Sequence, residues 1–348
     1  MSELTGRDLL STLDWTSDEL RSVVDLALAL KHGEEPASFA GQVAALLFFN
    51  PSVRTRVSCE AALARGGGTA IAIQPGKDSW NFETADGVVM DAGTQEHVRE
   101  LAPVLARMCD FIGVRKSEMI TSGAGSAPVT ESYEVLAQDR FLHQLAEHAD
   151  VPVINLESNR FHPLQGLADM ATLVEHLERP AGSKYVLTWA WHPKSLPAAT
   201  PHSQLLAACD LGMDVTLLRP PGYSLEPAVL DAARARAESL GGALQETDNQ
   251  AAAYEGAHVV CAKSWGALGS YGAFEEEARA KQALRADWIV DERKMAATQE
   301  GVFMHCLPVR RNVIVTDGVL DSRRSLVIDQ AENRLWTAAA VFKALGET

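Results

Sequence analysis

Short apolar runs recur along the chain at intervals long enough to hold a helix. The runs cover residues 43–49, 111–114, 151–155, 185–189, 215–218, 259–262 and 302–306. Alanine-rich stretches with helical periodicity lie between some of them, for example at 205–209 and 229–240. Strands that alternate with helices predict parallel sheets whose two faces are both covered. We therefore expect an α/β fold, with ligands bound at the carboxyl ends of its strands.

Two segments interrupt this pattern and are predicted to be loops. Residues 122–128 are mainly Ser, Gly and Ala, and residues 193–201 contain three prolines. The length of 348 residues corresponds to roughly two domains of ~150 residues each. A boundary near residue 155 would divide the chain into two α/β halves. Residues 325–345 are expected to begin like a strand and to continue as a terminal helix.

The charge balance limits the possible partners. The chain has 31 basic and 46 acidic side chains, so its formal net charge is −15. Binding to nucleic acid or anionic lipid requires a basic surface, so we expect neither partner. No run approaches the ~20 apolar residues that span a membrane, and the first residues lack the features of a signal peptide. We expect a cytoplasmic protein that binds anionic ligands through a few local arginines.

The cysteine and glycine patterns argue against metal and dinucleotide sites. The five cysteines are scattered and form no CxxC pair, so neither a disulfide framework nor a zinc ribbon is indicated. We predict that they are small buried residues: Cys59, Cys109, Cys209, Cys261 and Cys306. A dehydrogenase of the Rossmann class would carry a GxGxxG fingerprint after a strand, and none is present. We expect neither a metal nor a cofactor.

The segment that follows the first apolar run has the composition of a phosphate site. Ser52 can cap a helix that ends at three glycines, residues 66–68. Free backbone N–H groups at the start of that helix, the hydroxyls of Ser52 and Thr55, and the guanidinium groups of Arg54 and Arg56 would surround an anion. On spacing alone, the two arginines could equally be helix residues that face solvent.

This turn is also the first of several motifs that resemble one family. Ser-x-Arg-Thr-Arg at 52–56 resembles the carbamoyl phosphate motif of the aspartate/ornithine carbamoyltransferase family. The further motifs follow in that family's order: a strand ending on Arg115, His-Pro-Leu-Gln at 162–165, His-Cys-Leu-Pro at 305–308 and Glu-Asn-Arg at 332–334. The resemblance spans nearly the whole chain and implies a carbamoyltransferase.

The resemblance also implies a role for each motif residue. Thr55, Arg115 and His162 would point donors at the carbonyl oxygen, and with Gln165 they form the expected catalytic set. Gln165 and two backbone carbonyls, of Cys306 and Leu307, would receive the carbamoyl NH2. The expected carbamoyl phosphate site comprises Ser52, Val53, Arg54, Thr55, Arg56, Trp80, Arg115, His162, Gln165, Cys306, Leu307 and Arg334.

Several of these residues have simpler interpretations from the sequence alone. His162 precedes a proline and could cap a helix, and Arg115 could form a surface ion pair. Cys306 is assigned no thiol chemistry. Trp80 is either a half-buried aromatic residue or similar to the family's mobile tryptophan, which reaches a neighbouring subunit's site. The second interpretation implies a homotrimer with shared active sites.

The amine substrate is suggested by the residues around Lys263. The sequence at 305–308 is similar to the ornithine branch of the family, but that branch carries an acidic residue with Ser-Met-Gly to hold the α-ammonium of free ornithine. This chain has Lys-Ser-Trp-Gly-Ala at 263–267. A cation there would repel an α-ammonium and attract an α-carboxylate. The substrate's α-amine is therefore expected to be acylated, as in the N-acylornithine carbamoyltransferases of arginine biosynthesis.

The acyl group is suggested by three further positions. Acetyl-preferring members of the family have an acidic residue at the position of Gln95 and a lysine at the position of Ile314. This chain is not similar to the acetyl type at either position. Glu157 lies five residues before His162, and this spacing is similar to that of the succinyl-preferring relatives. Residues 263–266 and 332–334 are more similar to the acetyl type. We expect N-succinyl-L-ornithine first and N-acetyl-L-ornithine second, bound by Glu157, Lys263, Gln95, Arg310 and Leu307.

The resemblance implies two doubly wound parallel-sheet domains with the active site in the cleft between them. The expected carbamoyl phosphate domain covers residues 1–155 together with a C-terminal helix at 327–346, and the N-acylornithine domain covers 156–326. The resemblance also implies a knotted second domain, with the loop at 193–201 forming part of the threading. Two alternatives remain: an enzyme that uses free ornithine, or an inactive homologue that serves as a binding subunit.

Overall fold

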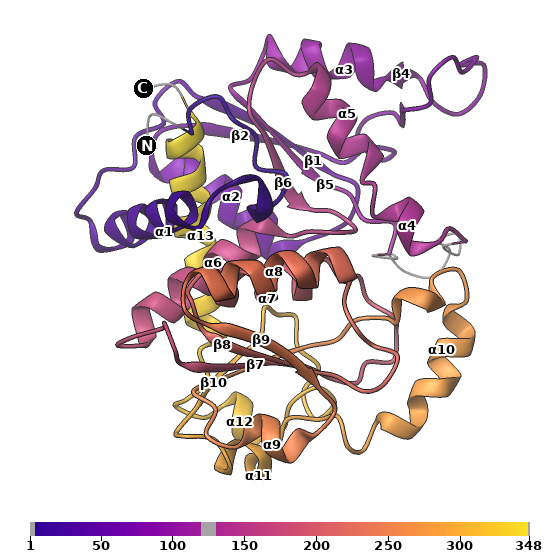
Figure 1. Cartoon of the computed structure of the whole chain (residues 1–348). Helices are drawn as coiled ribbons and strands as arrows, with labels where there is room; N and C mark the ends of the chain where they lie inside the picture. Colours follow the sequence, from indigo (N-terminus) through magenta and orange to yellow (C-terminus); the bar gives the residue numbers. More distant parts are fainter. Residues whose placement is uncertain (1–3, 120–129, 347–348) are drawn as a thin grey trace. The chain divides into compact units, whose positions relative to one another are not determined.

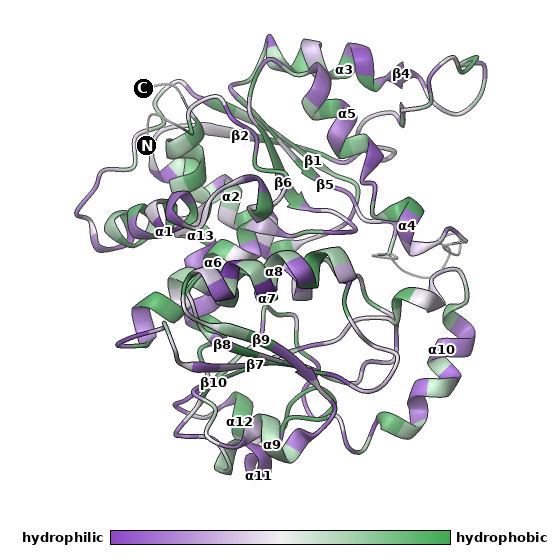
Figure 2. Cartoon of the chain, viewed as in Figure 1, coloured by the Kyte–Doolittle hydropathy of each residue, from purple (hydrophilic) through white to green (hydrophobic). Residues whose placement is uncertain are grey.

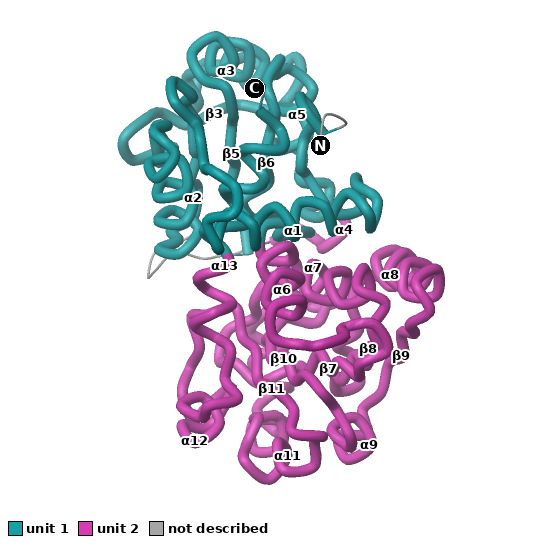
Figure 3. Tube along the Cα trace, turned by 90° about the vertical axis from the view of Figure 1, so that its left-hand side faces the viewer, with its two compact units in different colours: residues 1–126, 136–164, 334–348 teal, residues 127–135, 165–333 magenta. Residues whose placement is uncertain are grey.

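The computed structural model describes residues 4–119 and 130–346 and divides the chain into two compact units (Figures 1 and 3). Unit 1 comprises residues 1–126, 136–164 and 334–348, and unit 2 comprises residues 127–135 and 165–333. The loop predicted at 122–128 lies outside the described residues. Both units contain a parallel sheet, which confirms the predicted α/β class.

Unit 1 is built on a parallel sheet with strand order β2-β1-β5-β6. Its strands are β1 (Val43–Phe48), β2 (Thr69–Ile73), β5 (Phe111–Arg115) and β6 (Val153–Glu157). A separate parallel pair joins β3 (Phe82–Glu83) to β4 (Glu96–His97). Its helices are α1 (Ser17–His32), α2 (Val53–Arg65), α3 (Val98–Ala106) and α5 (Arg140–His148), with the later turns of α13 (Val327–Leu345).

Apolar side chains cover both faces of this sheet. Helices α3 and α5 pack on one face, where Leu101 and Phe141 join Ile112 and Val114 in one core cluster. Phe111, on the other face of β5, packs at 5.1 Å between ring centroids against Phe342 of α13. Figure 2 shows apolar residues along the strands and polar residues on the outer surface of α5. The helices therefore cover the faces and leave the ends of the strands for other groups.

Unit 2 is built on a parallel sheet with strand order β11-β10-β7-β8-β9. Its strands are β7 (Lys184–Trp189), β8 (Asp214–Leu218), β9 (Ala243–Thr247), β10 (Val259–Lys263) and β11 (Val302–Met304). The longer helices are α6 (Pro163–His176), α7 (Ala199–Cys209) and α8 (Pro227–Ser239). The shorter ones are α4 (Tyr133–Leu136, continuing past the unit boundary), α9 (Gln250–Tyr254), α10 (Phe274–Ala280), α11 (Glu292–Ala296) and α12 (Asp317–Leu320). Three 3-10 turns complete the described secondary structure, at Thr12–Asp14, Leu268–Ser270 and Lys281–Leu284.

Each of the seven apolar runs overlaps a strand, but four of the described strands were not predicted: β2, β3, β4 and β9. β3 and β4 are only two residues long, and β9 is an edge strand with two apolar residues in five. β2 is also an edge strand; its residues 70–73 are apolar, but the sequence analysis did not include them among the runs. The loop prediction at 193–201 is wrong for its last three residues, because α7 begins at Ala199. Pro201 lies in the first turn of that helix, where a missing N–H costs nothing. The strand-like start at 325 is a single bridge between Phe303 and Ser325.

The five cysteines are buried and form no disulfide, as predicted. Among the described residues, no helix is both long and apolar enough to cross a membrane. The same part of the chain holds no group of three or more His, Cys, Asp or Glu side chains arranged for a metal ion.

Candidate active site

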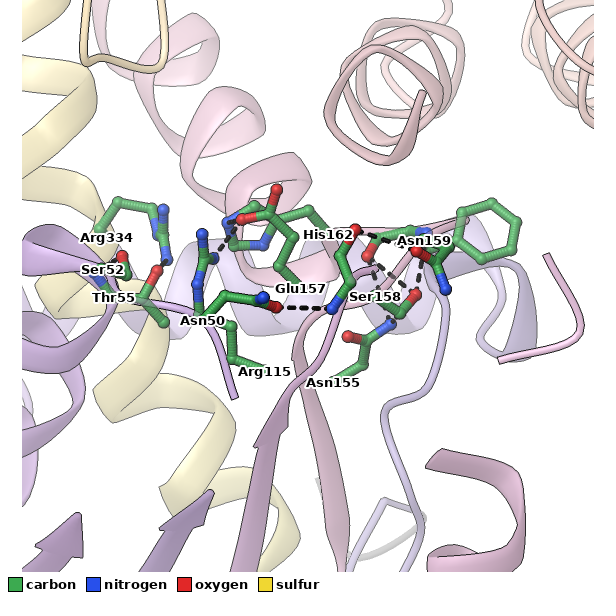
Figure 4. Close-up of polar contacts among 12 residues, drawn as sticks. Asn50, Ser52, Thr55, Arg115, Asn155, Glu157, Ser158, Asn159, His162 and Arg334 are labelled. Carbon is green, nitrogen blue, oxygen red and sulfur yellow. Dashed lines mark hydrogen bonds and ion pairs between the residues drawn. The ribbon is translucent and has the colours of Figure 1, made fainter. Parts of the chain in front are cut away.

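The carboxyl edge of the unit 1 sheet brings three chain segments together. Phe48, Arg115 and Glu157 end three neighbouring strands, and the register pairs Phe48 with Arg115 and Arg115 with Glu157. The residues that follow these strands therefore meet at one edge of the sheet. Figure 4 shows their side chains converging there.

The first segment forms the predicted helix start. Ser52 is the N-cap of α2, and its hydroxyl accepts a hydrogen bond from the Thr55 N–H at 3.2 Å. Thr55 is buried, whereas Val53 is exposed. Arg56 forms an ion pair with Glu60 at 2.8 Å, and both side chains remain about 40% exposed. The free N–H groups of α2 create a site for an anion, and of these side chains Thr55 lies closest to the buried cations.

Arg334 is the buried cation beside this helix. Its Nη2 donates to Thr55 Oγ1 at 3.0 Å, although 279 residues separate the two in the chain. Only 3% of Arg334 is exposed. Burial, assisted by the charges of Arg115 and Arg54, lowers the pKa of Arg334 to about 10. The guanidinium stays charged at neutral pH, so this pocket favours an anionic ligand.

Arg115, Glu157 and His162 form the second cluster. Arg115 Nη1 pairs with Glu157 Oε2, and His162 Nε2 lies 3.5 Å from the same oxygen. All three are buried, which excludes the surface ion pair considered for Arg115. Arg115 Nε is buried and has no partner within the described part of the chain. A buried donor of this kind needs an acceptor, and a substrate oxygen would supply one.

Sequence reasoning missed the polar groups that surround this cluster. They are Asn50, Ser117, Asp139, Asn155, Ser158 and Asn159, and they form one hydrogen-bonded network. The only signal in the sequence is the polar run at 157–159 directly after an apolar strand. Such a run reads as an ordinary loop until the tertiary contacts are known.

Gln165 lies in a buried amide and carboxylate cluster of unit 2. Its Nε2 donates to Asp169 Oδ1 at 2.7 Å, and Asp169 also accepts from Gln204 and Gln330. Gln330 in turn accepts from the backbone N–H of His305 at 2.9 Å. This cluster connects α6 to the segment that follows β11.

Cys306 and Leu307 lie directly after β11. The Leu307 N–H donates to His305 Nδ1 at 2.9 Å, and Leu307 has a positive φ of 56°. A left-handed backbone is rare for such a residue and is found mainly where the surrounding structure requires it. The Cys306 side chain is buried.

The charges of Lys263 and Arg310 both lower the pKa of His192, a residue that the sequence analysis did not select. Arg310 Nε donates to His192 Nε2 at 3.0 Å. Burial is the main cause that lowers the pKa of His192 to about 4, and the charges of Arg310, Lys263 and Lys281 add to it. His192 is therefore a neutral acceptor at pH 7, set among cations at the carboxyl edge of the unit 2 sheet.

Trp80 and Gln95 lie beside the small β3–β4 pair. Trp80 Nε1 donates to Glu96 Oε2 at 2.7 Å, and the Gln95 N–H donates to the Asn81 carbonyl at 3.2 Å. Trp80 is 49% exposed. Within the described residues, neither side chain makes a hydrogen bond to Thr55, Arg115 or His162, so the structure does not join them to the buried cluster.

Two parallel-sheet α/β units, with buried arginines at the carboxyl edge of the unit 1 sheet, define a class of two-domain α/β proteins suited to an anionic ligand. Family models agree with this class. Residues 7–175 match the carbamoyl-P binding domain, and residues 196–345 match the Asp/Orn binding domain, of the aspartate/ornithine carbamoyltransferases. The chain belongs to the aspartate/ornithine carbamoyltransferase family.

Individual relatives give a finer comparison. The chain is 44% identical to an N-acetylornithine carbamoyltransferase of Xanthomonas campestris over 97% of both proteins. It is 38% identical to an N-succinylornithine carbamoyltransferase of Bacteroides fragilis over 87% of this chain and 86% of that protein. The crystal structure of an acetylornithine transcarbamylase complexed with acetylcitrulline matches with a TM-score of 0.92 and 43% identity, covering 98% of this chain and 100% of that one.

Proposed function

We propose that this protein transfers the carbamoyl group of carbamoyl phosphate to the side-chain amine of an N2-acyl-L-ornithine. The products are an N-acylcitrulline and phosphate, within arginine biosynthesis. The observation that carries the proposal is the buried guanidinium of Arg334, which donates to Thr55 at the start of α2. Unit 1 then binds carbamoyl phosphate and unit 2 binds the acylornithine.

The reaction needs no protein nucleophile. A neutral amine attacks the carbamoyl carbon and a tetrahedral oxyanion forms. The C–O bond to phosphate then breaks, phosphate leaves with the electron pair of that bond, and the attacking nitrogen releases one proton. The protein has to hold the reactants in line and stabilise the two developing negative charges. The α2 N-terminus, Thr55 and Arg334 bind the phosphate in this proposal, while Arg115 and His162 direct their donors to the carbonyl oxygen.

Glu157 requires a more specific role than substrate contact alone. Its carboxylate pairs with Arg115 and lies near His162. This arrangement keeps both donors at the edge of the sheet before substrate arrives. Gln165, Cys306 and Leu307 remain predicted contacts of the carbamoyl amine, and Arg54 and Arg56 remain predicted contacts of the phosphate.

Lys263 and Arg310 support an acylated amine substrate. Both are cations at the carboxyl edge of the unit 2 sheet, and both lower the pKa of His192 through their charge. A free α-ammonium would be repelled there, whereas the α-carboxylate of an acylated ornithine would be attracted. The proposed partner of the α-carboxylate is Lys263, and Arg310 is the proposed partner of a substrate carboxylate.

The relatives reverse the order of acyl groups expected from Gln95 and Ile314. The 44% identical relatives are named for N-acetylornithine, and the 38% identical one for N-succinylornithine. A glutamate-to-alanine variant of an N-acetyl-L-ornithine transcarbamylase, 44% identical with a TM-score of 0.91, is solved with N-succinyl-L-norvaline. We propose N-acetyl-L-ornithine as the preferred substrate, with N-succinyl-L-ornithine accepted because Gln95 carries no negative charge.

The subunit arrangement is part of the same proposal. We propose a cytoplasmic homotrimer in which Trp80 reaches the site of a neighbouring subunit. The half-exposed Trp80 and the exposed apolar residues Val53 and Val57 of α2 support an interface on unit 1. Sedimentation equilibrium measures the mass directly, and a monomer at micromolar concentration would overturn the trimer.

The decisive experiment compares three amines. Carbamoyl phosphate is incubated with N-acetyl-, N-succinyl- or free L-ornithine, and the citrulline-type product is quantified. We expect product from both acyl forms and little from free ornithine. Robust activity on free ornithine alone would refute the role of Lys263, and no product from any amine would refute the enzyme assignment.

A further inference from the structure

The turn between β6 and α6 carries two residues of the candidate site. Glu157 ends β6, and His162 directly precedes α6. Four residues separate them, yet His162 Nε2 lies 3.5 Å from the Glu157 carboxylate. The shape of residues 158–161 therefore decides whether these two side chains meet at Arg115.

Ser158 forms hydrogen bonds with Phe161 across this turn. Its N–H donates to the Phe161 carbonyl at 2.9 Å, and its hydroxyl oxygen accepts from the Phe161 N–H at 3.1 Å. Asn155 Nδ2 also donates to that hydroxyl, at 3.1 Å. These bonds are local and satisfy the turn, but on their own they do not attach it to the rest of unit 1.

Asp139 supplies the attachment. Its carboxylate accepts from Ser158 Oγ at 2.5 Å, from the Asn159 N–H at 2.9 Å and from the Arg160 N–H at 3.4 Å. Asp139 is only 8% exposed. Three donors from one turn therefore converge on a single buried carboxylate, which lies outside that turn.

Two features of Asp139 show that this position is not used as an ordinary helix cap. It precedes α5, but its side chain makes no capping bond to that helix. Its backbone has a positive φ of 43°, which is unfavourable for a residue other than glycine. Asp139 therefore has neither a capping bond nor a favourable φ, and its carboxylate instead contacts residues 19 to 21 positions away.

Asn159 connects the turn to the strand that carries Arg115. Its Oδ1 accepts from Ser117 Oγ and from the Glu118 N–H, both at 3.0 Å. Its Nδ2 donates to Glu118 Oε2 at 2.6 Å and to the Leu136 carbonyl at 3.0 Å. The Ser117 N–H donates to Asn50 Oδ1 at 2.6 Å. The network thus joins the ends of β1, β5 and β6, as Figure 4 shows.

We propose that Asp139 is a positioning residue for carbamoyl transfer: it holds the 158–161 turn so that Glu157 and His162 meet Arg115. This inference rests on the proposed function, since the cluster it positions is the one assigned to the carbonyl oxygen. The Asp139 carboxylate accepts hydrogen bonds from Ser158 and from the backbone of the turn, and it makes no hydrogen bond to Glu157, His162 or Arg115 among the described residues.

Charge makes the contribution of Asp139 dependent on pH. Burial is the main cause that raises the pKa of Asp139 to about 6, and the charge of Glu118 adds to it. The bonds from Ser158, Asn159 and Arg160 act in the opposite direction. The ionisable groups around it are Glu118, Lys116 paired with Glu118, Arg160 over the Phe161 ring, and Arg140 and His143 of α5.

Stability and activity should respond to pH in opposite directions at this residue. The folded pKa lies above the ordinary value of 3.8, so the stability that Asp139 contributes is complete below pH 4 and decreases as the pH rises through about 6. The three bonds from the turn, in contrast, need the ionised form. Activity that falls on acidification through pH 6 would therefore not reflect unfolding caused by Asp139.

The test is Asp139→Asn, which keeps the size of the side chain but removes one acceptor. We expect kcat to fall about 10- to 100-fold, because misplacing reacting groups is costly. We expect KM for carbamoyl phosphate to change little, and the fall in kcat near pH 6 to disappear. The matched control is Asp291→Asn, since Asp291 caps α11 in the ordinary way through Lys294 N–H at 2.8 Å. It should leave kcat and its pH profile unchanged.

A second variant keeps the proposal testable if Asp139→Asn fails to fold. Ser158→Ala removes the hydroxyl that donates to Asp139, and it should lower kcat and shift the same limb of the pH profile. Wild-type kcat and an unchanged pH profile in either folded variant would overturn the proposal.

A readout independent of catalysis separates this proposal from the proposed function. The NMR signal of the His162 ring reports its environment next to Glu157 whatever reaction is catalysed. Asp139→Asn should shift that signal and Asp291→Asn should not. An inactive wild-type protein would refute the carbamoyltransferase proposal alone, whereas an unshifted His162 signal would refute the positioning role.

Discussion

The carboxyl edges of the two sheets hold their cations in different ways. In unit 1, Arg115 and Arg334 are buried and already contact Glu157 and Thr55. In unit 2, Arg310 is exposed and Lys263 half-buried, and the Arg310 guanidinium donates to the neutral acceptor His192. The cations at the unit 1 edge are therefore held in place by protein groups. The cations at the unit 2 edge are more accessible to a substrate carboxylate.

This difference follows from the cost of burying charge. A buried guanidinium needs a partner, and removing that partner leaves an uncompensated charge in the interior. An exposed cation is stabilised by water and needs no partner from the protein, so it can pair with a substrate carboxylate. Substitutions in unit 1 should therefore affect folding and catalysis together, while substitutions in unit 2 should affect substrate affinity.

The largest effect is expected for Arg115→Ala. Removing a donor to the carbonyl oxygen should lower kcat by roughly 10²- to 10³-fold. Leaving Glu157 without its partner should lower the free energy of unfolding by about 3–5 kcal/mol. Steady-state kinetics and urea unfolding measure the two effects. Arg99→Ala, which breaks an exposed pair with Asp86, is the control, and equal stability of the two variants would contradict the comparison.

The next effect concerns the pH dependence of stability through His192. Its folded pKa of about 4 lies below the ordinary value of 6.5. The stability it contributes is therefore present above pH 6.5 and is lost as the pH falls towards 4, by up to about 3 kcal/mol.

Replacing His192 tests this linkage. Urea unfolding between pH 4 and 7 should show a weaker pH dependence for His192→Gln than for the parent. Substitution of the exposed His32 by Gln is the control and should leave the curve unchanged. A His192→Gln curve that parallels the parent would show that another group is responsible.

Lys263→Met should separate binding from catalysis. Loss of a charged hydrogen bond to the substrate carboxylate should raise KM for N-acetylornithine by roughly 10- to 100-fold. KM for carbamoyl phosphate and the stability should stay near the parent values, since Lys263 makes no ion pair among the described residues. Arg293→Met removes an exposed cation from the same unit as a control. A selective effect on carbamoyl phosphate would assign Lys263 to the other substrate.

The smallest effect is expected for Gln95→Glu. A carboxylate at this exposed position should repel the additional charge of the succinyl group and lower the ratio of succinyl to acetyl activity by about tenfold, or 1.4 kcal/mol. The ratio of kcat/KM values for the two substrates is the measurement, and Gln95→Asn is the neutral control. If both variants give the parent ratio, Gln95 does not discriminate between the acyl groups.

The sequence alone indicated the α/β class, the seven strands that form apolar runs, the helix that Ser52 caps, and the family. These features are local, because each depends on the periodicity of neighbouring residues or on a short motif. Four strands were not predicted: β9 has only two apolar residues in five, β3 and β4 are two residues long, and the apolar residues 70–73 of β2 were not included among the runs. Gln95 and Ile314 favoured the succinyl group, whereas the relatives named for N-acetylornithine are more similar to this chain than those named for N-succinylornithine.

Only the tertiary structure decided which groups meet. Arg115 and Glu157 are 42 residues apart in the chain, and Arg334 and Thr55 are 279 apart. Their contacts depend on the register of the parallel sheet and the course of α13, which no local pattern specifies. The role of Asp139 is visible only there as well, because its sequence position resembles an ordinary helix start while its carboxylate holds a turn 19 residues further along. Burial then decides the charges at this edge, since desolvation is the main cause that raises the pKa of Asp139 and lowers the pKa of Arg334.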